Sequence, residues 1–200
     1  MAQEAPLPTF SQLHIERMKK LEGKLVDCAF FPTYLDCKLP QQFVDVGWGD
    51  EKNTEIVCLF GNHLPLSECT DKPRVIFQCR EKNYYSVVAF DADHDDSALP
   101  FLLWHRVNLH GDQNFSSGKD MVRWQQPLVS GGHHRIFFAV FKQMGGEVDV
   151  TNAPVVAKND MERRRQWNLR AFLQEKRLKF VAANSCCVFS PSCLEGGPSP

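Results

Sequence analysis

The stretch that decides the fold runs from Tyr84 to Gln143 and reads YYSVVAFDADHDDSALPFLLWHRVNLHGDQNFSSGKDMVRWQQPLVSGGHHRIFFAVFKQ. It contains three long apolar runs, at 84–90, 101–109 and 135–143, which are rich in aromatic and β-branched side chains. This composition is typical of buried strands. Polar and glycine-containing segments that favour turns separate the runs. The stretch therefore predicts three β-strands.

Polar residues gather where the first predicted strand ends and the third begins. Asp91 and Asp93 follow the first run. Gly132 and His134 precede the third. If the two strands are neighbours, their polar ends bring the aspartates towards His134. An EF-hand is excluded, because Leu102 stands where its bidentate glutamate is required. An acidic turn is the commoner interpretation of the cluster and metal binding the rarer one, so we predict no metal site.

Outside this centre, short alternating runs predict further strands. Residues 43–48 and 54–60 are expected to form a hairpin, and 75–79 to pair with the strand that enters the acidic turn. A last strand is predicted at 186–189. Several short strands at this spacing indicate a mainly antiparallel β architecture.

Around these residues the sequence resembles the phosphatidylethanolamine-binding-protein family, also called Raf-kinase-inhibitor-like. Asp91-Ala92-Asp93-His94-Asp95 stands where the family has Asp-Pro-Asp-Ala-Pro. Gly132-His133-His134-Arg135 stands where it has Gly-x-His-Arg, and Val107-Asn108-Leu109-His110-Gly111 matches a strand end between them. The resemblance is closest to a divergent branch found in the large subunit of mitochondrial ribosomes.

The resemblance implies a mainly β fold with flanking helices, built from antiparallel β-sheets of the phosphatidylethanolamine-binding-protein type. We expect the family-like domain at 42–189, an N-terminal helix and connecting segment at 1–41, and a flexible C-terminal tail at 190–200. Apolar residues from Phe10 to Leu25 recur every three to four positions, as in an amphipathic helix. Its apolar stripe is expected to pack on its own domain; docking on a neighbour is the ribosomal alternative.

In the family, a small anion-accepting pocket is formed by an aspartate, a strand histidine, and the histidine and aromatic residue of Gly-x-His-Arg. When this site is carried across residue by residue, Asp91 and His134 survive, and we assign the vestigial pocket to Asp91, Asp93, Gly132 and His134. The strand histidine, however, falls on Leu103 and the aromatic residue on Ile136. A phosphate group would therefore lose several hydrogen bonds. We interpret the pocket as vestigial, expect no cofactor and no tightly held small molecule, and predict a structural ion pair between Asp93 and Arg135.

A strongly charged segment from Met161 to about Lys179 is predicted as one helix, capped by Asn159 and Asp160. Its basic residues include Arg163, Arg164, Arg165, Arg170, Lys176 and Arg177. A solvated helix face is the commoner explanation of such a run. It is nevertheless the local patch best able to reach phosphates, so we assign partner or RNA contact to these six residues.

Bulk composition limits the function classes. The chain has 23 basic and 24 acidic residues, so it lacks the basic excess of nucleic-acid-binding proteins and any RNA contact would be local. Eight cysteines without a CxxC pair indicate reduced thiols in a cytosolic or matrix compartment. No apolar run reaches membrane-spanning length. The first twenty residues include Glu4, Glu16 and a single arginine, and make a poor mitochondrial transit peptide.

Two function hypotheses follow. The first is a non-enzymatic structural component of the mitochondrial large ribosomal subunit, located in the matrix, with mitochondrial ribosomal proteins and rRNA as partners. The alternative is a free cytosolic adaptor that binds a phospholipid head group or another anion and modulates kinase signalling. Catalysis is not expected, because no serine or cysteine stands beside a base in a nucleophile arrangement.

Overall fold

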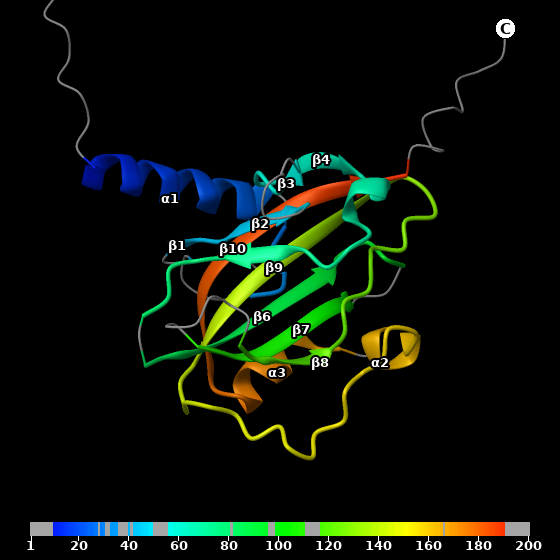
Figure 1. Cartoon of the computed structure of the whole chain (residues 1–200). Helices are drawn as coiled ribbons and strands as arrows, with labels where there is room; N and C mark the ends of the chain where they lie inside the picture. The colour runs from blue at the N-terminus through cyan, green and yellow to red at the C-terminus, as the bar shows by residue number, and fades with distance from the viewer. Residues whose placement is uncertain are drawn as a thin grey trace, which may run out of the picture.

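The computed structural model in Figure 1 describes residues 10–27, 29–30, 33–35, 40, 42–49, 56–80, 82–95, 99–110, 117–165 and 167–190, with side chains from Ile15 onward. Its elements are α1 (Phe10–Asp27), β1 (Gln42–Phe43), β2 (Asp45–Trp48), β3 (Ile56–Val57), β4 (Asn62–Pro65), the 3-10 helix η1 (Leu66–Cys69), β5 (Arg74–Ile76), β6 (Tyr84–Asp91), β7 (Phe101–His110), β8 (Lys119–Val122), β9 (His133–Gln143), α2 (Met161–Arg165), α3 (Leu169–Glu175) and β10 (Leu178–Phe189). Much of the predicted connecting segment, and the predicted tail from 191 onward, lie outside the described residues.

Two sheets form the frame, and the fold is mainly β with few helices, as predicted. The larger sheet has the order β1-β10-β9-β6-β7-β8, with β4 as a second parallel neighbour of β10. The smaller sheet has the order β3-β2-β5. Strands β10, β9, β6 and β7 are antiparallel to one another and lie side by side across the molecule (Figure 1). The three strands predicted at the centre are therefore neighbours.

Strand β9 is buried on both faces, because its side chains alternate between two cores. Ile136, Phe138 and Val140 are fully buried in the core that separates the two sheets. The alternate residues Phe137, Ala139 and Phe141 are fully buried in a second core on the helix side. The molecule thus has three layers: the small sheet, the large sheet, and a layer of helices and loops.

Helix α1 covers part of the second core with its C-terminal half. Leu21 and Leu25 are fully buried there, beside Phe30 in the segment that follows the helix. Ile15 and Val26 lie on the opposite side and are exposed. The described part of the apolar stripe thus packs on its own domain, as expected, whereas the side chains of Phe10 and Leu13 lie outside the described residues. Among the described residues, no helix is long and apolar enough to cross a membrane.

The side chain of Asn184 in β10 joins the two sheets. Its four hydrogen bonds reach the carbonyl oxygens of Val44 (2.9 Å) and Cys58 (3.1 Å) and the backbone amides of Phe60 (3.1 Å) and Ser185 (2.8 Å). The amide of Gly61 also donates to the carbonyl of Ser185, at 2.8 Å. These hydrogen bonds lie along the edge of β10 that faces away from β9. They fall between residues 182–183, which pair with β1, and residues 186–189, which pair with β4.

Two strand predictions were wrong. Strand β5 pairs with β2, at Asp45 opposite Ile76, instead of pairing with β6. The ring of Phe77 lies 5.2 Å from that of Tyr85, so this segment packs over β6 across the core between the sheets. The last strand begins at Leu178 rather than at 186. The predicted pairing of 43–48 with 54–60 is confirmed by β2 and β3.

The single helix predicted at 161–179 is also wrong, because the segment forms two short helices and the start of β10. Asn168 has extended backbone angles and its side chain accepts a hydrogen bond from the amide of Ala171, at 3.0 Å, so it caps a new helix, α3. Trp167 packs 6.0 Å from Phe90 of β6, measured between ring centroids. The predicted helix is therefore interrupted where the side chain of Trp167 turns towards the sheet.

Arg164 is the largest fully buried side chain among the residues that the structure describes. Its guanidinium donates to four backbone carbonyls, those of Leu102 (2.8 Å), Leu103 (3.0 Å), Arg123 (2.7 Å) and Ala157 (3.0 Å). Burial lowers its pKa to about 10. Assigning Arg164 to partner contact was therefore wrong: it fastens α2 to β7 and to the segments that follow β8.

The variant Arg164→Met is expected to lose about 3 kcal/mol or more of unfolding free energy, because four carbonyl acceptors lose their donor in a buried site. Arg163→Met makes the same charge change at an exposed position and should stay within about 0.5 kcal/mol of the unmodified protein. Urea unfolding measures both. Equal losses in the two variants would contradict the structural role of Arg164.

Candidate anion-binding site

The pairing of β6 with β9 brings the predicted polar residues together. Asp91 ends β6 opposite Ile136, so it lies beside the start of β9. The Nδ1 atom of His134 lies 2.8 Å from Oδ2 of Asp91. Polar residues from two distant sequence segments thus meet at one end of the sheet, as the strand-end argument predicted.

The Asp91–His134 pair is closed to solvent. Asp91 is fully buried and His134 is 6% exposed. The second oxygen of Asp91, Oδ1, accepts a hydrogen bond from the amide of Asp93 at 2.9 Å. The hydrogen bond with Asp91 raises the pKa of His134, against the opposing effect of burial. Both carboxylate oxygens of Asp91 are therefore occupied by groups of the protein itself.

Asp93 and Arg135 form the predicted ion pair. Asp93 Oδ2 accepts from the backbone amide and from Nε of Arg135, both at 2.8 Å, and Nη2 of Arg135 contacts Oδ1. Burial raises the pKa of Asp93, but the hydrogen bonds from Arg135 outweigh it and leave that pKa lowered. Gly132 has a φ of +71° in the exposed turn before β9, a conformation that glycine adopts without strain. Its role here is to shape the turn.

The two positions at which the family pocket has polar or aromatic groups lie in the core between the sheets. Leu103 and Ile136 are both fully buried there, together with Phe101. They offer no hydrogen bond to an anion. Because Asp91, Asp93 and His134 are already engaged with one another and with Arg135, the described geometry favours a closed, vestigial pocket.

The described carboxylates of the acidic turn diverge instead of converging on one point. Asp91 faces His134, Asp93 faces Arg135, and Asp95 lies 3.3 Å from Nε of Arg165 in α2. This geometry fits the acidic-turn interpretation. Asp96 lies outside the described residues.

Five of the six predicted contact residues remain on the surface: Arg163, Arg165, Arg170, Lys176 and Arg177. Several have intramolecular partners. Arg163 lies 3.5 Å from Asp160, and Arg170 donates to the carbonyl of Thr33 at 3.2 Å. The five residues surround α2 and α3 and form the basic surface.

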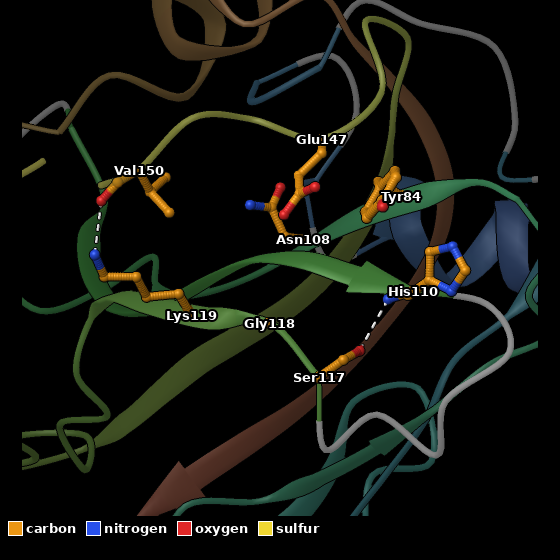
Figure 2. Close-up of a pocket in the computed structure, with 8 residues that line it drawn as sticks. All are labelled: Tyr84, Asn108, His110, Ser117, Gly118, Lys119, Glu147 and Val150. Atoms are coloured by element: carbon orange, nitrogen blue, oxygen red, sulfur yellow. Dashed lines mark hydrogen bonds between the residues drawn. The ribbon is translucent and has the colours of Figure 1, made fainter. Parts of the chain in front are cut away.

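An open pocket of about 400 Å³ lies at the other end of β6 and β7 and has no counterpart in the sequence predictions. Figure 2 shows Tyr84, His110, Lys119 and Glu147 around it. Lys119 Nζ donates to the carbonyl of Val150 at 2.6 Å, so its ammonium group is already engaged. Sequence reasoning could have found this pocket if the argument about polar strand ends had also been applied to the start of β6 and the end of β7.

His105 faces away from the Asp91–His134 pair. It lies in β7 with its ring 4.8 Å from that of Phe172 in α3, and it is 6% exposed. Its Nε2 atom has no hydrogen-bond partner in the described part of the chain. Burial lowers the pKa of His105 to about 4. This histidine is neutral at pH 7 and does not replace the missing strand histidine of the family pocket.

Acidification should destabilise the protein through His105. The unfolded chain takes up the proton near pH 6.5 and the folded chain only near pH 4, so stability falls as the pH drops between these values. The contribution from pH 7 to pH 4.5 is roughly 2–3 kcal/mol. Urea unfolding at the two pH values should show a smaller loss for His105→Leu than for the unmodified protein. Equal losses would show that His105 titrates normally.

The chain is 29% identical over 125 residues to Protein BROTHER of FT and TFL 1 of Arabidopsis thaliana and 28% identical over 128 residues to Protein CENTRORADIALIS of Antirrhinum majus. These matches cover 60% and 62% of this chain, and 66% and 67% of the relatives. The chain thus spans just under two thirds of the first relative's length. No family model matches the chain.

Two solved structures share the fold. The carboxypeptidase Y inhibitor, solved in complex with its cognate proteinase, has a TM-score of 0.64 at 18% identity and covers 90% of this chain and 97% of its own. A phosphatidylethanolamine-binding protein from Plasmodium vivax has a TM-score of 0.59 at 18% identity and covers 85% and 97%. At this identity the likeness shows the fold alone. The fold of this chain is therefore of the phosphatidylethanolamine-binding-protein type.

Proposed function

We propose that this chain is a non-enzymatic structural component of the mitochondrial large ribosomal subunit, built on a phosphatidylethanolamine-binding-protein-like fold whose anion pocket is closed. The observation that carries the proposal is the Asp91–His134 pair, in which both oxygens of a fully buried carboxylate are used by the protein itself. A domain with this closed pocket is suited to work through its surface.

The resemblance to the ribosomal branch rests in part on Leu103-Trp104 and on residues 134–143, and two side chains of these segments serve the scaffold. Trp104 Nε1 donates to Asp120 at 3.0 Å, which joins β7 to β8. Gln143 accepts from Ser86 Oγ at 3.0 Å and donates to Asn108 Oδ1 at 2.8 Å, which joins the end of β9 to β6 and β7. A frame that is kept while the pocket is closed supports a structural role in a larger particle.

The basic surface supplies the contact with the particle. Arg163 and Arg165 are more than half exposed, at 58% and 52% of their side chains, and their acidic neighbours Asp160 and Asp95 lie 3.5 and 3.3 Å away. Exposed pairs of this kind contribute little to stability and exchange readily for another anion. Phosphates of rRNA are suitable replacements, because arginine binds them through two parallel hydrogen bonds.

The test is sedimentation of tagged protein on a density gradient. We expect it to travel with large-subunit particles, and the variant with Arg163, Arg165 and Arg170 changed to Gln to shift towards the top, more so at higher salt, because counterions are released on phosphate binding. The matched control changes three exposed lysines of α1, Lys19, Lys20 and Lys24, to Gln and should stay with the particles. Unmodified protein found only at the top of the gradient would overturn the ribosomal role.

The cytosolic adaptor is the competing function and requires an accessible His134. Phosphorylethanolamine titrated to millimolar concentration should leave the His134 NMR signals unchanged, because the ring is paired with a buried carboxylate. The variant Asp91→Asn with His134→Gln should keep its place in the gradient once it is shown to be folded. Saturable shifts at His134, together with a basic-surface variant that still sediments normally, would favour the adaptor.

A further inference from the structure

Three potential metal ligands meet at the edge of the large sheet, on strands that are distant in sequence. His63 lies in β4, His133 begins β9, and Cys187 lies near the end of β10. The pairing register places Cys187 directly opposite His63, and His133 directly opposite Phe189. Strand β10 therefore carries the cysteine between the two histidines.

All three side chains point away from the core between the sheets. Their strand neighbours Leu64, Cys186 and Val188 belong to that core. Since successive residues of a strand face opposite sides, His63 and Cys187 face outward, on the side of the second core. His134 faces the other way, towards Asp91. The cluster thus lies on the opposite face of β9 from His134, next to the Asp93–Arg135 ion pair, because Arg135 is directly opposite Cys187.

The ligand atoms of the three residues lie within 4.8 Å of one another, and among the described residues they are the one group of histidine, cysteine or acidic side chains with this property. Zinc bonds of about 2.0–2.3 Å at tetrahedral angles separate ligand atoms by roughly 3.3–3.8 Å. The three ligand atoms therefore need to move only slightly closer together to bind one ion. His63 and His133 are exposed, so their rings can rotate to allow this movement.

The cluster has the chemistry of a borderline-soft metal site and few competing bonds. Neither imidazole makes a hydrogen bond to another described residue; the two rings touch edge to face, with centroids 4.9 Å apart. Cys187 is half-buried and forms no disulfide. Two imidazoles and one thiolate suit Zn²⁺, with a fourth position left for water or a partner's ligand.

We propose that His63, His133 and Cys187 form a binding site for a divalent metal ion of the zinc class, which ties β4 to β9 across β10. Strand β4 is four residues long and pairs only with β10 in the described part of the chain. A bound ion joins three segments that are far apart in the sequence and so adds to folding stability. Binding displaces the thiol proton of Cys187 as the sulfur–metal bond forms.

The experiment uses the full chain, freed of metal, and Co²⁺ as a spectroscopic probe. One Co²⁺ per chain should bind, with the absorption of a tetrahedral ion and a thiolate-to-cobalt charge-transfer band, and Zn²⁺ should displace it. Cys187→Ser should abolish the charge-transfer band. His63→Gln and His133→Gln should each weaken binding by more than about tenfold, which is the lower limit for losing even a group that only hydrogen-bonds to a metal ligand.

Cys79→Ser is the matched control, because Cys79 is also a free, partly exposed thiol. Its neighbour Arg80 is bonded to Tyr85, which pairs with Lys142 at the end of β9 opposite His133. Cys79→Ser should bind Co²⁺ as the unmodified protein does. Zn²⁺ should raise the melting temperature of the unmodified protein and of Cys79→Ser. It should not raise the melting temperature of Cys187→Ser or His63→Gln. Circular dichroism checks that these two variants are folded. Absence of the thiolate band in the unmodified protein, or its survival in Cys187→Ser, would overturn the site.

Discussion

The burial of β9 on both faces is the constraint on which the rest of the structure depends. A strand in this position needs apolar side chains at consecutive positions, and Ile136 to Phe141 supply six in a row without exposure. One face requires the small sheet and the other requires α1, α3 and the loop around Phe30. Apolar burial on this scale outweighs any single polar contact, so the three layers are set by this strand.

Because both faces of the central strands are used for packing, polar chemistry is left to their ends. Asp91 and His134 occupy one end of β6 and β9 on the side of the small sheet, and His133 occupies the same end on the opposite side. The polar pocket near Tyr84 lies at the other end. Neighbouring residues of one strand can thereby belong to two unrelated sites, as His133 and His134 do.

Sequence patterns predicted the central strands and the Asp91–His134 contact well, because alternation and strand ends are local signals. The failures have a different origin. Arg164 looks like Arg163 and Arg165 in sequence, and only the four carbonyls around it explain its burial. The cluster at His63 was missed because it depends on the register of β4 and β9 against β10, which no local pattern encodes.

The bonds around Asn184 affect how the protein behaves at high concentration. The outer edge of β10 is paired with β1 at 182–183 and with β4 at 186–189, and the carbonyl of Ser185 is taken by Gly61. A long sheet edge with free amides and carbonyls is a template on which a strand from another molecule can add. Along this part of β10 the backbone groups are already paired with other segments of the same chain. Two copies of the protein therefore cannot join their large sheets there without first displacing β1 or β4.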